Sequence, residues 1–150
     1  MSDPLVRHWD PKGECEGAVL RVYKYWCLEV SWVQHTIGAF IIFCRREGVE
    51  RETELTDAEL LELRDVKRDM QGALAAHPRF VPDRFNYWQM GNAFPQLHYH
   101  GIPRYKDLRV FGNQPWFDDS YGYLPHWSRF HVDRALVDML VSELKPHLPT

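Results

Sequence analysis

One segment of this sequence has the pattern of a long amphipathic helix. Thr56-Asp57-Ala58-Glu59 matches a capping box, in which the threonine hydroxyl and the glutamate carboxylate each satisfy a backbone donor at a helix start. After it, apolar residues recur at intervals of three or four until Pro78, with charged residues between them. These apolar positions are Leu60, Leu63, Val66, Met70 and Leu74. We therefore expect a helix whose apolar stripe packs against the core.

Segments typical of strands lie on both sides of this helix. Residues 18–33 and 36–44 are rich in β-branched and aromatic residues and predict two adjacent strands before it. Residues 84–90 and 96–102 predict two strands after it, joined at Gly91-Asn92, with Pro103 ending the second. A C-terminal helix is indicated by Val132, Leu136, Met139, Leu140 and Leu144. The order of these elements favours an α+β fold with an antiparallel sheet and helices on one side.

The length of 150 residues fits one domain, which we take as residues 1–150. Residues 1–17 contain two prolines and two glycines among charged residues and predict an irregular leader. Residues 106–129 combine glycine, proline and aspartate with many aromatic residues and predict a long ordered loop. Because aromatic residues make up 14% of the chain, we expect the core and any pocket to be lined by aromatic side chains.

Charge and cysteine content argue against several classes of protein. The formal charge is −3, from 18 basic and 21 acidic residues. The chain has no long block of like charge, so binding to duplex nucleic acid is not expected. Binding of an anionic small molecule is compatible with this charge, because a local pocket can be positive. The N-terminus lacks the pattern of a signal peptide and no stretch has the length and apolarity of a membrane span, so we expect a cytoplasmic protein. Cys15, Cys27 and Cys44 are odd in number and lack CxxC spacing, which disfavours a disulfide framework or a four-cysteine zinc site.

A row of polar side chains is the main candidate for chemistry. Residues at i, i+2 and i+4 of a strand share one face, so Gln96, His98 and His100 are expected to point the same way. Burying such a row is costly unless its members are hydrogen-bonded. Two histidines at this spacing are also common as structural or surface residues. They could instead supply two ligands of a metal site, with Cys44 or His35 on a neighbouring strand.

The residues around this row resemble a known family. Residues 86–105, NYWQMGNAFPQLHYHGIPRY, resemble the signature region of the histidine triad (HIT) family, His-φ-His-φ-His-φ-φ, which is often followed by Pro-Arg. In weaker form, residues 40–46 look like the family's strand before the helix, and residues 54–59 look like its helix start. The resemblance covers residues 20–105. It implies a HIT-like fold, with an antiparallel sheet of about five strands, one long helix and a C-terminal helix packed on it.

Aligning this chain with the family on Ile-Pro-Arg shows which residues would take the places of the three histidines. His98 takes the place of the middle histidine, which is the family's nucleophile, His100 that of the third histidine, and Gln96 that of the first. An amide can donate and accept hydrogen bonds in the supporting role of that first histidine. Where the family often has a further histidine before its strand, this chain has Ala39. His35 lies four residues earlier and would either complete the site through a bulge or cap a turn.

The resemblance implies a nucleotide hydrolase or nucleotidyltransferase that acts at the α-phosphate of nucleoside 5′-phosphate derivatives such as dinucleoside polyphosphates. A neutral imidazole can attack phosphorus near neutral pH, so His98 would form a covalent nucleotidyl-histidine, and His100 would bind the phosphate and assist the leaving group. Gln96 and backbone N–H groups near Gly91-Asn92 would hold the non-bridging oxygens. The scheme needs no cofactor and no metal, and members of the family commonly pair as homodimers.

Three further residues each have two interpretations. Asn86 and Asn92 could contact ribose or phosphate, or could serve as turn residues. Arg104 could pair with a polyphosphate, although an arginine after a proline at a strand end is usually solvated. A last alternative for the whole chain is a nucleotide-binding module without turnover, because Gln96 and Ala39 stand where the family has histidines.

Overall fold

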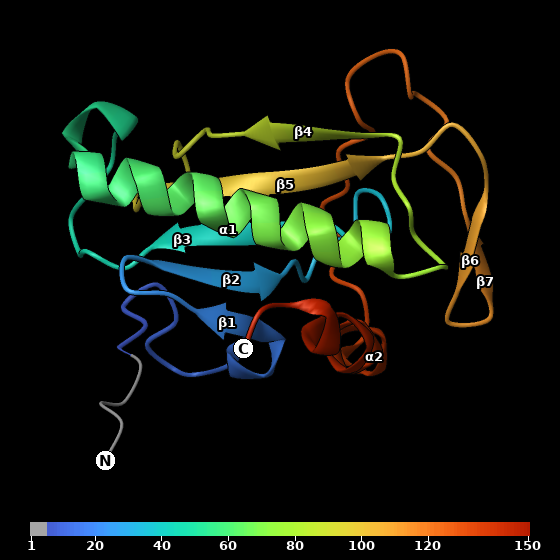
Figure 1. The fold of residues 1–150 in the computed structure, drawn as a ribbon, viewed down its shortest axis with the longest axis horizontal. Coiled ribbons are helices and arrows are strands. Elements are labelled where there is room, and N and C mark those ends of the chain that lie inside the picture. Colours follow the sequence, from blue (N-terminus) through green and yellow to red (C-terminus); the bar gives the residue numbers. More distant parts are fainter. Residues whose placement is uncertain (1–5) are drawn as a thin grey trace.

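The computed structural model describes residues 6–150, and its centre is a five-stranded antiparallel sheet with the strand order β1-β2-β3-β5-β4 (Figure 1). The strands are β1 (Val19–Val22), β2 (Trp26–Val30), β3 (Phe40–Cys44), β4 (Arg84–Trp88) and β5 (His98–Arg104). The long helix α1 (Asp57–Ala76) lies across one face of this sheet, and α2 (Arg134–Leu144) packs beside β1. The α+β fold expected from the sequence is therefore confirmed.

Helix α1 begins and ends where its sequence pattern indicates. The Thr56 hydroxyl accepts a hydrogen bond from the Glu59 backbone N–H at 3.2 Å. The Glu59 carboxylate does not complete a capping box with the Thr56 backbone. It accepts instead from the Thr56 hydroxyl at 3.1 Å and from the Arg46 side chain at 3.0 Å. Glu59 thereby connects the start of α1 to the loop that follows β3.

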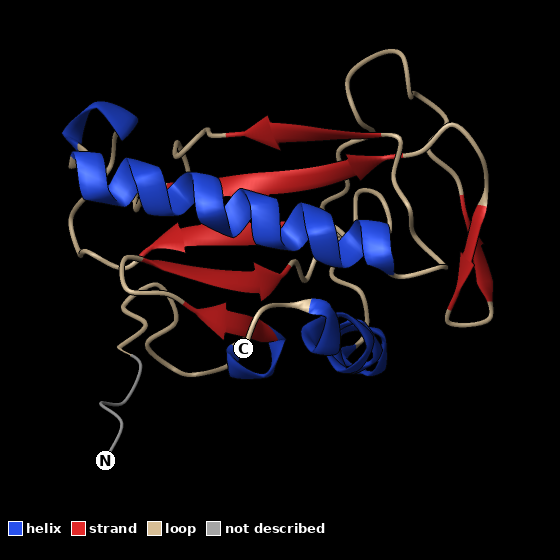
Figure 2. Cartoon of the chain, in the orientation of Figure 1, coloured by secondary structure: helices blue, strands red, loops and turns tan. Residues whose placement is uncertain are grey.

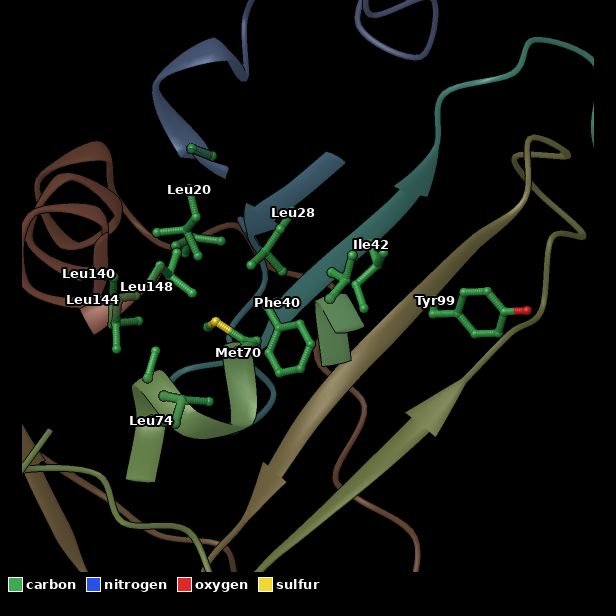
Figure 3. Close-up of a cluster of buried hydrophobic side chains, with 14 of the residues drawn as sticks. Leu20, Leu28, Phe40, Ile42, Met70, Leu74, Tyr99, Leu140, Leu144 and Leu148 are labelled. Carbon is green, nitrogen blue, oxygen red and sulfur yellow. The ribbon is translucent and has the colours of Figure 1, made fainter. Parts of the chain in front are cut away.

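The core fills the space between α1, the sheet and α2 (Figure 3). Met70 and Leu74 of α1 are fully buried against Phe40 and the other apolar side chains of the sheet that point toward the helix. Leu140 of α2 is equally buried at the edge of the same cluster. The apolar stripe predicted for residues 60–74 is thus the helix face that builds the core, except for Leu60, which is exposed.

Residues 18–33 form two strands and not the single strand we expected. The chain reverses at Tyr23–Tyr25, and the backbone N–H groups of Lys24 and Tyr25 donate to the Glu62 carboxylate of α1 at 3.2 and 2.5 Å. The sequence of this turn contains no glycine, proline, asparagine or aspartate, which are the residues that usually indicate one. The Glu62 carboxylate of the distant helix α1 accepts the backbone hydrogen bonds of this turn instead. The local sequence pattern therefore could not predict the turn.

Strand β5 also differs from its expected limits, since it begins at His98 and continues through Pro103. The pairing between β3 and β5 ends at Gly101, and Pro103 pairs only with Phe85 of β4. The missing N–H of the proline therefore removes no hydrogen bond to β3, and the strand tolerates it. The Thr36 hydroxyl donates to the free Pro103 carbonyl at 2.5 Å.

The two segments expected to be irregular are partly ordered. Residues 106–129 contain a hairpin of β6 (Arg109–Phe111) and β7 (Gln114–Trp116), which stands apart from the main sheet (Figure 2). Its turn places Gly112 and Asn113 at φ +64° and +59°, the conformation that glycine and asparagine favour. The described part of the leader has only turns before the short 3-10 helix Glu16–Ala18, and residues 1–5 lie outside the described residues. Two more 3-10 helices, Glu52–Glu54 and Lys145–His147, precede α1 and follow α2. No helix in residues 6–150 has the length and apolarity needed to cross a membrane.

Candidate active site

The face of the sheet opposite α1 carries the histidine pair. Strand register places His98 opposite Phe43 of β3, and His100 opposite Ile41 of β3 and Trp88 of β4. Cross-strand partners share a face, and the residues between them, such as Tyr99, point into the core under α1. His98 and His100 therefore project together from the open face, as the alternation of the sequence predicts.

The ring of His98 is held in one tautomer. Its Nδ1 lies 2.7 Å from the backbone carbonyl oxygen of Gln96. A carbonyl oxygen can only accept a hydrogen bond, so in the neutral ring Nδ1 carries the hydrogen and Nε2 retains a free lone pair. The ring stacks on Phe43, with centroids 5.4 Å apart, and Phe94 lies 5.8 Å away. His98 is only 7% exposed, which limits access of water to it.

Two further imidazoles stand in line beside His98. The centroid of His100 is 5.0 Å from that of His98, and the centroid of His35 is 6.4 Å from that of His100. Burial, followed by the neighbouring His98 and His35, lowers the pKa of His100 to about 4. Burial alone lowers the pKa of His35 to about 4. Both rings are therefore neutral near pH 7 and can each offer one N–H donor.

His35 reaches this row from the loop between β2 and β3. The Gln34 side chain folds that loop onto itself, because its amide donates to the carbonyls of Ser31 and Ala39 at 2.8 and 2.9 Å and accepts from Gly38 N–H at 2.7 Å. Gly38 has φ +88°, a left-handed conformation that a side chain would strain. Of the two interpretations of His35, the loop geometry favours the one that brings its ring to the site.

A cavity of about 310 Å³ opens beside His35 and His100. Its apolar walls come from the N-terminal segment, from β2 and β3, and from the chain before α2. They include Trp9, Trp32, Ile41, Phe43 and Trp127. Trp9 stacks almost parallel on Phe43, with centroids 4.9 Å apart. The expected aromatic-lined pocket is present, and its size is at the lower end of the range for small-molecule sites.

The acidic groups at this cavity are satisfied within the protein. Glu29 accepts from the Arg7 side chain and from Trp9 Nε1, the latter at 2.8 Å. Asp10 accepts from Arg7 and from the backbone N–H of Cys15 at 2.9 Å. These contacts dock the leader on the open face of the sheet, a role that its proline- and glycine-rich sequence did not indicate. Alternation within residues 40–44 could have placed Ile41 and Phe43 on this face, but Trp9 carried no such signal.

Solved structures share the fold of this chain, whereas its sequence matches no family model and no curated protein. A histidine triad protein from Sinorhizobium meliloti has a TM-score of 0.64 at 15% identity, covering 91% of this chain and 95% of that chain. For one from Marinobacter aquaeolei the TM-score is 0.62 at 20% identity, with coverage of 89% and 91%. A hypothetical histidine triad nucleotide-binding protein from Sulfolobus tokodaii has a TM-score of 0.62 at 14% identity, with coverage of 87% and 82%. The fold is that of histidine triad proteins. The HIT-like fold implied by the signature region is therefore confirmed.

Within this HIT fold, Gln96 lies just before β5 and not on it. Its amide donates to the carbonyls of Cys44 and Arg46 at 2.8 and 3.0 Å, and its carbonyl oxygen accepts from Gly48 N–H at 3.1 Å. Both amide hydrogens are used inside the protein, so the side chain has none left for a phosphate. Gln96 contacts His98 only through its own backbone carbonyl, and its side chain holds the loop after β3 in place.

Replacement of Gln96 by alanine is expected to lower the free energy of unfolding by roughly 2–3 kcal/mol, because the buried carbonyl of Cys44 and the partly buried carbonyl of Arg46 lose this donor. Urea unfolding at neutral pH measures this change. Gln114→Ala, at an exposed position of β7, serves as the control and should stay within about 0.5 kcal/mol of wild type. A Gln96→Ala midpoint equal to the wild-type midpoint would contradict the assigned role.

Asn86 and Arg104 lie further along the open face and are engaged with each other. Arg104 is 1% exposed, and its guanidinium donates to Asn86 Oδ1 at 2.8 Å and to both carboxylate oxygens of Asp118 at 2.7 and 3.0 Å. It also donates to the carbonyls of Ser120 and Tyr123. The expectation that Arg104 is solvated at a strand end is wrong. All of its donors are occupied, so it has none to offer a phosphate.

Two other candidate features have clear positions. Gly91, with φ +73°, and the exposed Asn92 belong to the loop between β4 and β5, which also carries Phe94 over His98.

Cys44 points to the opposite side of the sheet, where its thiol lies 3.8 Å from Glu59. A metal site that joins Cys44 to His98 and His100 is therefore ruled out by geometry. Among the described residues, no group of three histidine, cysteine or acidic side chains is arranged to hold a metal ion.

Proposed function

We propose that this chain is a HIT-type hydrolase or nucleotidyltransferase acting at the α-phosphate of nucleoside 5′-phosphate derivatives, with dinucleoside polyphosphates as one substrate type. The observation that carries this proposal is the 2.7 Å contact between His98 Nδ1 and the Gln96 carbonyl. It leaves the Nε2 lone pair of His98 free on a face that also holds two neutral imidazoles and a cavity. A neutral imidazole with a free nitrogen is a competent nucleophile near pH 7.

The proposed reaction has two displacements at phosphorus. In the first, the lone pair of His98 Nε2 forms a bond to the α-phosphorus while the bond from that phosphorus to the leaving group breaks, and the leaving group departs with the electron pair. In the second, a water or another acceptor forms the new bond to phosphorus, loses a proton to solvent and displaces Nε2. Splitting the transfer in this way replaces one difficult step by two easier ones.

The surrounding groups have separate parts in this proposal. The cavity beside His100 would hold the nucleoside, because its walls are mostly aromatic and aliphatic. N–H donors of His100 and His35, with the backbone of Gly91 and Asn92, would hold the phosphate oxygens. Gln96 acts by supporting His98. Asn86 and Arg104 do not contact the phosphate in this proposal, because they bind each other and the segment that follows β7.

The covalent step can be tested directly. Rapid acid or base quenching during turnover of a dinucleoside polyphosphate, followed by digestion and mass spectrometry, should find one nucleoside monophosphate unit on the peptide that contains His98. Phosphoramidate bonds to imidazole survive base and break in acid, so the adduct should persist only in the base-quenched sample. Adduct on another residue, or steady turnover without any adduct in base, would contradict the assignment.

The alternative of a nucleotide-binding module without turnover makes a different prediction for the same protein. Nucleoside monophosphates would raise its melting temperature, yet no derivative would be consumed. The free Nε2 of His98 favours turnover over binding alone, because binding a nucleotide does not require a nucleophilic nitrogen. We further propose that residues 1–150 act as one domain and pair as homodimers, with β4, the last strand of the sheet, as the available edge.

A further inference from the structure

The chain between β7 and α2 crosses the open face of the sheet without forming a helix or strand. We call residues 117–131 the strap. In Figure 1 it passes behind the sheet, on the side away from α1, before it enters α2. Residues from its second half, including Trp127 and Ser128, line the cavity beside His100. The strap therefore covers the same face that carries the proposed catalytic histidine.

One end of the strap is anchored by Arg104. The guanidinium forms a bidentate ion pair with Asp118, and the side chains of both residues are almost fully buried. The same group donates to the backbone carbonyls of Ser120 and Tyr123 at 2.6 and 2.8 Å. The Tyr105 backbone N–H adds a bond to Asp118 at 3.1 Å. Bidentate pairs of this kind fix orientation as well as distance.

The other end of the strap is attached to the site itself. The Ser128 backbone N–H donates to His35 Nδ1 at 3.0 Å, which requires the hydrogen of the His35 ring to be on Nε2. Just past the strap, Val132 N–H donates to the Trp32 carbonyl at 2.8 Å. The strap is thus attached at both ends, and its attachment fixes the tautomer of His35.

Between these two attachments, Trp127 lies against the histidine rings. It stacks on His35 with centroids 3.8 Å apart and planes 21° apart, and it meets His100 edge to face at 5.2 Å. The ring centroid of Trp88 of β4 lies 5.8 Å from that of Trp127. An aromatic ring at these distances shields part of each imidazole from water and restricts its rotation.

We propose that Trp127 is a positioning residue that packs on the rings of His35 and His100 and holds them in place, and that Arg104 anchors the strap that carries it. The proposal rests on the proposed function for its catalytic meaning, although the geometry of the rings does not depend on it. Without the strap, His35 would lose both its stacking partner and the donor on Nδ1. A loop histidine freed in this way could rotate out of the row.

The titratable groups around His100 do not by themselves account for its lowered pKa. His98 precedes it on β5, His35 faces it from the β2–β3 loop, and the same cavity is lined by Asp10, Cys15, Glu29 and His131. An acidic neighbour would raise the pKa of His100, whereas burial lowers it to about 4. The groups that bury the ring therefore dominate, and Trp127 of the strap is one of them, with its ring centroid 5.2 Å from that of His100.

The proposal can be tested by NMR titration of the imidazole rings, which needs no substrate. His35→Gln and His100→Gln assign the two signals. Trp127→Ala is expected to raise both midpoints from about 4 by roughly one pH unit or more, toward the usual value near 6.5. Trp127→Phe keeps an aromatic ring, so its two midpoints should lie close to those of the wild type. Phe130→Ala removes an aromatic ring of the strap that is 83% exposed and should leave both midpoints unchanged.

A second variant tests the anchor. Asp118→Asn keeps the shape of the side chain and weakens the ion pair with Arg104, so its midpoints should lie between those of wild type and Trp127→Ala. Unchanged midpoints in a folded Trp127→Ala protein would overturn the proposal, and so would equal shifts in Phe130→Ala. Activity is a separate readout. If His98 proves not to be the nucleophile, the proposed function fails while the titration still decides the role of the strap.

Discussion

His98→Asn is expected to abolish turnover of nucleotide derivatives, with a loss in kcat of about 10³-fold or more. The asparagine amide can replace Nδ1 as donor to the Gln96 carbonyl, so the local hydrogen bond survives. What disappears is the free nitrogen at the position of Nε2, which is the proposed nucleophile. Steady-state assays with a dinucleoside polyphosphate measure the effect, and the covalent adduct should vanish with it.

The matched control for this variant is His147→Ala. His147 is an exposed histidine in the last 3-10 helix, next to His77 and away from the open face of the sheet. It should retain wild-type kcat and KM. Thermal unfolding of both variants shows whether the fold is intact. Substantial activity in a folded His98→Asn protein would reject the assignment of His98 as nucleophile.

Gly101→Ala is expected to cause the largest loss of stability, about 3 kcal/mol or more, or to prevent folding. A Cβ at Gly101 would overlap the ring of Phe40, its cross-strand neighbour on β3. That ring is 1% exposed and packs between strand and helix, so it has no free space to move into (Figure 3). Chemical denaturation measures the loss, and a reduced yield of soluble protein would accompany it.

The same substitution at Gly72 is the control and should have the opposite sign. Gly72 lies inside α1, and a Cβ there would meet nothing within 4 Å. Alanine favours helix over glycine by about 1 kcal/mol, so Gly72→Ala should raise the free energy of unfolding. Equal stability of Gly101→Ala and wild type would show that the Phe40 ring has another place to lie.

The candidate site was predictable from the sequence only in part. The i, i+2 spacing places His98 and His100 on one face of a strand in any fold. The resemblance to the HIT signature indicated which of the two corresponds to the middle histidine of the motif. The role of Gln96 was not predictable. Its side chain binds backbone groups about fifty residues away, at Cys44 and Arg46, which no local pattern records.

Arg104 shows the same limit. An arginine after a proline at a strand end is usually solvated, but here a carboxylate and two carbonyls from the strap converge on it and bury it. Trp127 and His35 are separated by ninety-two positions in the chain, yet their rings stack. Contacts of this kind depend on where a loop crosses the sheet, and loops without secondary structure have no periodicity to predict their path.

By itself, the sequence determined the elements whose signals are local. Helix α1 follows from the spacing of its apolar residues and the Thr56 cap, and the shared face of His98 and His100 follows from the two-residue period of a strand. Only the tertiary structure decided which partners complete those elements. It supplied the Glu62 carboxylate for the turn before β2, the carbonyl that selects the tautomer of His98, and the strap over His100. Each of these is a hydrogen bond or stacking contact between distant parts of the chain, and such contacts exist only once the sheet has brought those parts together.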